Sequence, residues 1–124
     1  SFALAEVIKA ASPYKLVFFC GNLRHDAIPN ELPAAGIPVE EITVYHTALT
    51  PTRVMRDYDG IVFSSPSSVE SYFRMNTVAY TQALFPMGRT TAASIQKKTT
   101  HAVQLPGEPG KEALVDRVIS FYRE

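Results

Sequence analysis

Short runs of β-branched and aromatic residues alternate along this chain with segments whose apolar residues have helical spacing. This alternation constrains the fold most, because strands separated by helices pair in parallel through right-handed crossovers. We therefore predict an α/β fold of parallel sheets with flanking helices. The expected strands are 16–20, 42–46, 60–64, 84–87 and 101–105, and the expected helices are 2–11, 27–35, 66–74, 89–98 and 111–122. The first strand, LVFFC, is continuously apolar, so we expect cover on both of its faces.

The bulk composition limits the classes of partner and location. The chain has 124 residues, 46% of them apolar, with a formal net charge of zero and a single cysteine. A neutral chain has no general basic field, which argues against nucleic acid and anionic membranes as partners. One cysteine cannot form an internal disulfide, and the longest apolar run is far shorter than a membrane span. We therefore expect a globular protein in a reducing, cytoplasmic setting.

Three of the expected strands lead directly into a polar turn and a helix. The turns are CGNLRHD (20–26), SSPSSVE (64–70) and MGRTTAAS (87–94). Each lies where the first N–H groups of a helix lack intrahelical partners, at the sheet edge where open parallel sheets bind ligands. Since helix N-termini attract anions, Ser65, Ser67 and Thr90 are candidate anion ligands. The alternative is that these hydroxyl residues only cap their helices.

Cys20 has two interpretations. It is either a thiol nucleophile activated by the following helix, or a buried residue at the end of an apolar strand. Only three residues separate it from Arg24, too few for the amide cradle of a phosphatase-type thiolate. We therefore expect a buried and inert Cys20, with Asn22 and Arg24 as the better ligand candidates at this strand end.

Other catalytic motifs are missing from the sequence. It contains no G-x-S-x-G elbow, no P-loop and no G-x-G-x-x-G fingerprint. The three histidines lack metal-ligand spacing, so we expect no metal site. Tyr45 stands out, because it lies near a strand end and precedes the polar passage HTALTPT, which is typical of a connection between domains.

Four segments together resemble the uroporphyrinogen-III synthase family. LVFFCGNLRHDAIPNELPAAGIPVEEITVYHT is similar to the family's run of strand, G-N/G-x-x-R turn, helix, glycine stop and V-Y-x-T strand. DGIVFSSPSSVESYF resembles its F-x-S-P-S-x-V/L element, MGRTTAASI its I-G-x-T-T-A-x-x-L element, and PGKEALVDRVISFY its closing helix. The resemblance runs from about Leu4 to Phe121. Because family members are longer and this chain begins without a Met, we place it on the C-terminal half of the chain of such a protein.

The resemblance implies a cofactor-free lyase that converts hydroxymethylbilane into uroporphyrinogen III, with loss of water and inversion of ring D. It also implies two α/β domains joined by a two-stranded ladder, with the substrate between them. Residues 1–42 would be the C-terminal part of the inserted domain, 43–50 the connecting strand and 51–124 most of the outer domain. The implied catalytic residue is Tyr45, and the substrate-binding residues are Asn22, Arg24, Ser65, Ser67, Thr90 and Thr91. The alternative for Tyr45 is a structural role, as a strand tyrosine packed at the domain junction.

Two further expectations concern the chain as a whole. An incomplete two-domain architecture leaves strand edges and apolar helix faces uncovered, so we expect either self-association through these edges or collapse of both pieces into one continuous α/β layer. In either case we expect no synthase activity from these residues alone. The alternative function is a non-catalytic flavodoxin-like or receiver-like module that binds a small anion or a partner protein, because a fold does not determine a function.

Overall fold

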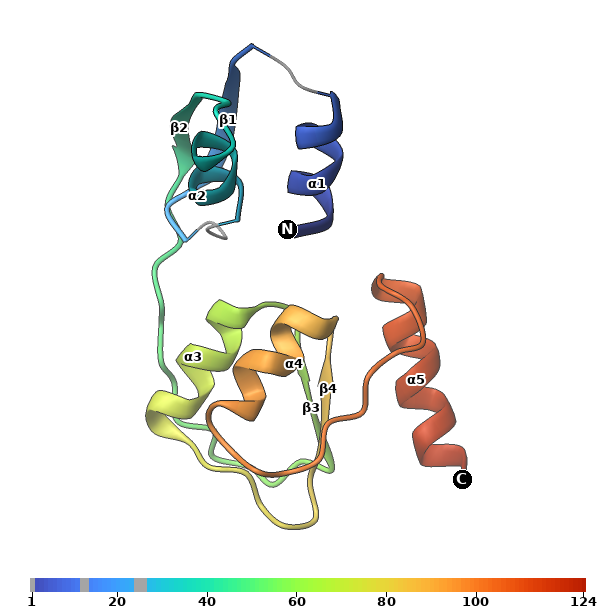
Figure 1. The fold of residues 1–124 in the computed structure, drawn as a ribbon. Coiled ribbons are helices and arrows are strands. Elements are labelled where there is room, and N and C mark those ends of the chain that lie inside the picture. Colours follow the sequence, from blue (N-terminus) through green and yellow to red (C-terminus); the bar gives the residue numbers. More distant parts are fainter. Residues whose placement is uncertain (1, 12–13, 24–26) are drawn as a thin grey trace. The chain divides into compact units, whose positions relative to one another are not determined.

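The structure, a computed structural model, describes residues 2–11, 14–23 and 27–124. The chain divides into two compact units, Ser1–Ala48 and Leu49–Glu124, each with its own parallel sheet (Figure 1). The predicted α/β class with parallel strands and flanking helices is confirmed. Within the described residues, no helix has the length and apolar content needed to cross a membrane.

The first unit contains α1 (Phe2–Ala11), β1 (Leu16–Gly21), α2 (Ala27–Ala34) and β2 (Val39–Tyr45). The two strands pair in parallel, with Phe19 opposite Ile42. Gly36 has a φ of 84°, a left-handed conformation that glycine adopts without steric cost, and it turns the chain from α2 towards β2. Residues 43–45, the start of the predicted connecting strand, belong to β2 and lie alongside β1. The assignment of the two units to inserted and outer domains stays a prediction.

The core of the first unit lies on one side of its sheet. Ala5 of α1 and Ile28 and Leu32 of α2 are buried there, with Leu16 and Phe18 of β1 packed against them. The alternate residues of the strands lie on the other face and are solvent-exposed: Val17 (50%), Phe19 (61%), Ile42 (37%) and Val44 (54%). We call these four side chains the open face.

The expectation that LVFFC is covered on both faces was therefore wrong. A continuous apolar run shows that a strand can be buried on both sides, but the second cover has to come from other elements. In the described residues α1 and α2 both pack on the same face, which leaves the open face without a helix.

The second unit contains β3 (Gly60–Phe63), α3 (Pro66–Met75), β4 (Ala83–Pro86), α4 (Arg89–Gln96) and α5 (Lys111–Arg123). Strands β3 and β4 pair in parallel, with Phe63 opposite Pro86. Helices α3 and α4 cover one face of this sheet and α5 covers the other (Figure 1). The two resulting cores are formed by Phe63, Val69, Leu84 and Ile95 on one face and by Ala83, Phe85 and Leu114 on the other.

The expected strand 101–105 is reduced to a single bridge between Val103 and Leu84. The Gln104 N–H donates to the Leu84 carbonyl at 2.8 Å, as in a parallel ladder. The next bond of that ladder would need an N–H from residue 106, which is a proline and has none. The apolar pattern predicted a strand here, and Pro106 ends it after one contact.

Candidate functional site

The carboxyl ends of β1 and β2 bring together Gly21, Asn22 and Tyr45. The pairing register shifts between Cys20 and Gly21, so that Gly21 lies opposite Tyr45. The Tyr45 ring packs closely against Gly21, because a Cβ at position 21 would lie 2.9 Å from the Tyr45 hydroxyl oxygen and nearer still to its ring carbons. Tyr45 is nevertheless 61% exposed. Its phenol therefore lies at the surface of the unit, over the strand end.

Asn22 binds the backbone of Tyr45 itself and of Thr47, two residues further along the chain. Its N–H donates to the Tyr45 carbonyl at 3.2 Å. Its side-chain Oδ1 accepts from the Thr47 N–H at 2.6 Å, and its Nδ2 donates to the Thr47 carbonyl at 3.1 Å. Both ends of the amide are thus bonded to one backbone residue.

The other two predictions at this strand end have different outcomes. Cys20 is 5% exposed, with its Sγ 3.9 Å from the Ile42 carbonyl oxygen, so its predicted burial is confirmed. Arg24 lies outside the described residues.

In the second unit, the start of α3 is closed by its own side chains. Ser65 is the N-cap residue, and its Oγ accepts from the Ser68 N–H at 3.2 Å. The Ser68 hydroxyl oxygen in turn accepts from the Ser65 N–H at 3.2 Å, which completes a capping box. The Ser65 and Ser67 hydroxyls lie 3.0 Å apart. Of the two hydroxyl groups predicted to bind anions, that of Ser65 therefore caps the helix, and that of Ser67 contacts it.

The start of α4 is different, because its N-cap residue is Gly88, which has no capping side chain. The first intrahelical bond runs from the Ala92 N–H to the Gly88 carbonyl at 2.9 Å. The N–H groups of residues 89–91 precede it and have no acceptor within the helix. Thr90 is exposed and Thr91 is buried. This helix start is the more open of the two to an anion.

The starts of α3 and α4 are neighbours, because they follow paired strand ends. The Met87 N–H donates to the Phe63 carbonyl at 2.9 Å, which extends the β3–β4 pairing to the base of both turns.

Glu70 of α3 accepts a hydrogen bond from Lys98, with 2.9 Å between Nζ and Oε2. The Lys98 ammonium lowers the pKa of the Glu70 carboxyl, with a smaller contribution from Arg74. This ion pair thus joins α3 to the residue segment just after α4, in addition to the packing of Val69 and Ile95 in one core.

A groove of about 690 Å³ lies at the opposite, amino edge of β3 and β4, and sequence reasoning missed it. Its charged lining residues are Arg53, Arg56, Asp57 and Arg74. These residues precede β3 or end α3, whereas the predicted residues of this unit follow the carboxyl ends of the strands. The arginines at 53, 56 and 74 were the available signal, but they stand far apart in the sequence and match no motif.

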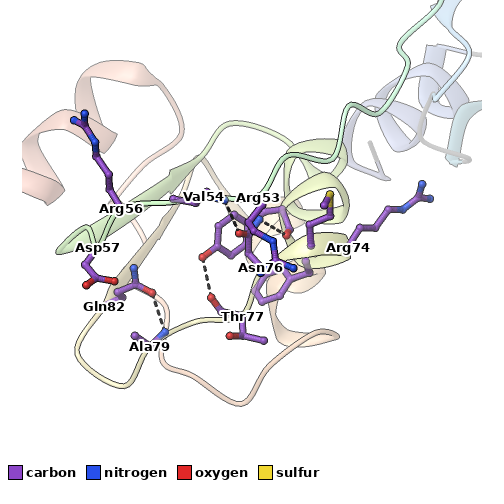
Figure 2. A pocket seen from close by; sticks show the side chains of 12 residues that line it. Arg53, Val54, Arg56, Asp57, Arg74, Asn76, Thr77, Ala79 and Gln82 are labelled. Carbon is purple, nitrogen blue, oxygen red and sulfur yellow. Dashed lines mark hydrogen bonds between the residues drawn. The ribbon is translucent and has the colours of Figure 1, made fainter.

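Asn76 lines this groove, and its side chain is bonded to the backbone of a neighbouring segment. Its Oδ1 accepts from the Val54 N–H at 2.8 Å (Figure 2). Its Nδ2 donates to the Thr52 carbonyl at 2.8 Å. Figure 2 also shows Arg56 and Arg74 pointing away from each other, so their guanidinium groups do not converge on one point. The groove therefore has an asparagine held by two backbone bonds in its lining, and arginines that point in different directions.

Comparison with known proteins gives consistent matches. The family model described as uroporphyrinogen-III synthase HemD matches residues 1–116, so the match includes both units and is not limited to the C-terminal half of the chain. Uroporphyrinogen-III synthase of Saccharomyces cerevisiae is 43% identical over 44 residues, which are 36% of this chain and 16% of that protein.

A solved structure shares the fold. The crystal structure of uroporphyrinogen-III synthetase from Helicobacter pylori superposes with a TM-score of 0.74 at 15% identity, over 98% of this chain and 60% of that one. The chain thus spans less than two thirds of either relative. Because the family model covers nearly its whole length, the chain belongs to the uroporphyrinogen-III synthase family.

Proposed function

We propose that this chain supplies part of the site at which hydroxymethylbilane is converted into uroporphyrinogen III. The supporting observation is the family match over residues 1–116, which includes the turns at the strand ends of both units. We further propose that the first unit is the remaining part of an inserted domain and the second unit most of the outer domain. A cytoplasmic location is part of the proposal and is supported by the single cysteine.

In this proposal the substrate's carboxylates bind at helix starts. The N–H groups of residues 89–91 and the Thr90 hydroxyl bind a carboxylate in this proposal, and the positive end of the α4 dipole adds to the attraction; the support is an N-cap, Gly88, that has no capping side chain. Thr91 shapes the same turn from its buried side. Ser65 and Ser67 contribute from the neighbouring turn through the oxygen lone pairs that capping leaves free. Arg24 is a charged partner in the proposal, because guanidinium binds carboxylate strongly.

Tyr45 acts at the hydroxymethyl group. Its phenol donates a hydrogen bond and a proton to the departing hydroxyl, which leaves as water while the electron-rich pyrrole supports the cation. The substituted carbon of ring D bonds to this cationic carbon to form a spiro intermediate, the original bond from ring D to its methylene bridge breaks, and the free carbon of the inverted ring D then bonds to that bridge. The proton lost from this carbon on closure balances the one that left in water. This chemistry needs no strong nucleophile, so the main contribution of the protein is to hold the linear chain in the reactive conformation.

The test measures the isomer of uroporphyrinogen formed from hydroxymethylbilane. The chain spans 60% of the H. pylori protein, so we expect no isomer III from the 124 residues alone. We expect isomer III when the remaining part of a full-length family member is added as a separate polypeptide. The matched control is the same mixture with Tyr45→Phe and Thr90→Ala combined, which should lower the yield strongly. An isomer ratio that stays at the uncatalysed value, together with no binding of hydroxymethylbilane, would contradict the proposal.

A further inference from the structure

The position of Tyr45 depends on Asn22, whose side chain is bonded to the backbone of Thr47. The end of β2 is followed by residues 46–58, which have no regular secondary structure, and a strand end in that situation is prone to fraying. Tyr45 is the last residue of β2. Its backbone therefore needs restraint from beyond the strand if its phenol is to keep one place.

Asn22 provides this restraint. An asparagine amide has the same donor and acceptor as a peptide group, and here both bind Thr47, at 2.6 Å to its N–H and 3.1 Å to its carbonyl. With the bond from the Asn22 N–H to the Tyr45 carbonyl at 3.2 Å, the parallel ladder continues past the strand by one side-chain step. The backbone of Tyr45 is thus held on its C-terminal side as well as by the strand.

Gly21 restrains the Tyr45 ring, because the ring packs against its backbone. With the backbone of Tyr45 fixed, only two side-chain torsions remain, and the ring rests on the bare backbone of Gly21. A methyl group at position 21 would occupy the volume of the ring. The position of the phenol is therefore determined jointly by the Asn22 amide and the absence of a side chain at Gly21.

We propose that Asn22 is a positioning residue that acts through Tyr45 and is not a ligand of the substrate. Both ends of its amide are bonded to Thr47, so turning it towards a substrate would break two backbone hydrogen bonds and release the end of β2. This inference rests on the proposed function in one respect only, namely that the phenol of Tyr45 takes part in the reaction. The positioning itself is a property of the first unit.

The first experiment needs no turnover. The chain is labelled with 3-fluorotyrosine, and the ¹⁹F resonance that disappears in Tyr45→Phe is assigned to Tyr45. We expect this resonance to move to the position of free 3-fluorotyrosine in Asn22→Ala and in Gly21→Ala. Asn22→Asp keeps the acceptor for the Thr47 N–H but loses the donor, so we expect an intermediate shift. Asn30→Ala, an exposed asparagine on α2, is the matched control and should leave the resonance unchanged.

Circular dichroism of each variant shows whether the unit is folded. If Asn22→Ala does not fold, Asn22→Asp and Gly21→Ala still test the two halves of the arrangement separately. An unchanged Tyr45 resonance in folded Asn22→Ala or Asn22→Asp overturns the proposal.

The second experiment separates a positioning residue from a ligand. In the complemented assay, Asn22→Ala should lower kcat by about tenfold in the presence of Tyr45 and by less than about twofold in the Tyr45→Phe background, with KM changed little. Equal factors in both backgrounds, or a rise in KM alone, would show that Asn22 contacts the substrate itself. Because the fluorine measurement is independent of turnover, failure of the proposed reaction and failure of the positioning role give different results.

Discussion

The hydroxyl groups of Ser65 and Thr90 have different surroundings at two neighbouring helix starts. Ser65 accepts from the Ser68 N–H and closes α3, whereas Thr90 is exposed in the first turn of α4, after a glycine N-cap. Loss of the first hydroxyl removes a helix cap, and loss of the second removes a group that faces solvent. The two residues should therefore affect different measurements.

We expect Ser65→Ala to lower the free energy of unfolding by about 1 kcal/mol, the usual cost of an N-cap serine. Thr90→Ala should change it by less than about 0.5 kcal/mol. In the complemented assay, Thr90→Ala should instead cost about 1–2 kcal/mol of transition-state stabilisation, the scale of a hydrogen bond to a charged group. Urea titration and kcat/KM measure the two quantities. Equal loss of stability in both variants would show that Thr90 has a structural role that the hydrogen bonds do not reveal.

Cys20 should be dispensable for the chemistry, because its thiol is buried at the end of β1. We expect Cys20→Ala to retain turnover in the complemented assay and to lose about 1 kcal/mol of stability through the missing sulfur. Cys20→Ser places a hydroxyl in the same buried space and serves as the comparison. Loss of turnover in Cys20→Ala at unchanged thermal stability would revive the thiol-enzyme interpretation.

Sequence reasoning reached these residues with uneven success, for a physical reason. The burial of Cys20 follows from the apolar run that precedes it, because hydrophobic pattern and burial are directly related. The difference between Ser65 and Thr90 depends on which residue becomes the N-cap, a shift of one or two positions that propensities do not resolve. The bonds of Asn22 to Thr47 join residues 25 positions apart and could not be read from local spacing.

At the scale of elements, Glu70 of α3 forms an ion pair with Lys98, which lies just after the end of α4. Lys98 and Arg74 both lie near this carboxylate, at 2.9 Å and 3.7 Å. Because these cations lower its pKa in the folded state, the stabilisation is present above the unfolded pKa of about 4.5 and is lost as the pH falls through the lower folded value.

We therefore expect Glu70→Gln to lower the melting temperature at pH 7 relative to the unmodified chain, with the difference vanishing as the pH falls through the lowered folded pKa of Glu70. Thermal melts across this pH range measure the effect, and added salt should reduce it because the pair is exposed. Glu108→Gln, in an exposed turn, is the matched control. A difference that persists unchanged below the folded pKa of Glu70 would show that packing, not charge, connects the two helices.

The elements themselves follow from alternation, capping residues and glycine stops, and these signals are local. What covers each element is not local. The continuous apolar run of β1 gives the same pattern whether one face or two faces of the strand are buried. The apolar pattern at 101–105 contains no information on the next ladder bond, which Pro106 cannot form. Both errors arise where the outcome depends on a partner distant in sequence.

At the scale of the whole molecule, the first unit presents an apolar sheet face to solvent. The open face combines exposed side chains from both strands of that unit, and such a surface promotes association. We expect concentration-dependent self-association by sedimentation velocity, reduced in Phe19→Lys. Val7→Lys changes an equally apolar residue that is 66% exposed on α1, and should leave the association unchanged. A chain that stays monomeric at high concentration would contradict this expectation.

The two units have separate cores, one covered on a single sheet face and the other on both. We expect the first unit to unfold at lower urea concentration than the second, so that unfolding is not a single two-state transition. Hydrogen exchange followed by peptide mass spectrometry reports on β1 and β4 separately. Coincident loss of protection in both strands would show that the units are stabilised as one.

The place of Cys20 also gives the molecule an internal reporter. Its thiol is shielded at the end of β1, and it is the single cysteine of the chain. An alkylating reagent can therefore reach sulfur only during moments when the first unit opens, and under fast reclosing the labelling rate gives the free energy of that opening. Measured across urea concentrations, one mass increment would follow the local unfolding of the first unit while the second unit stays folded.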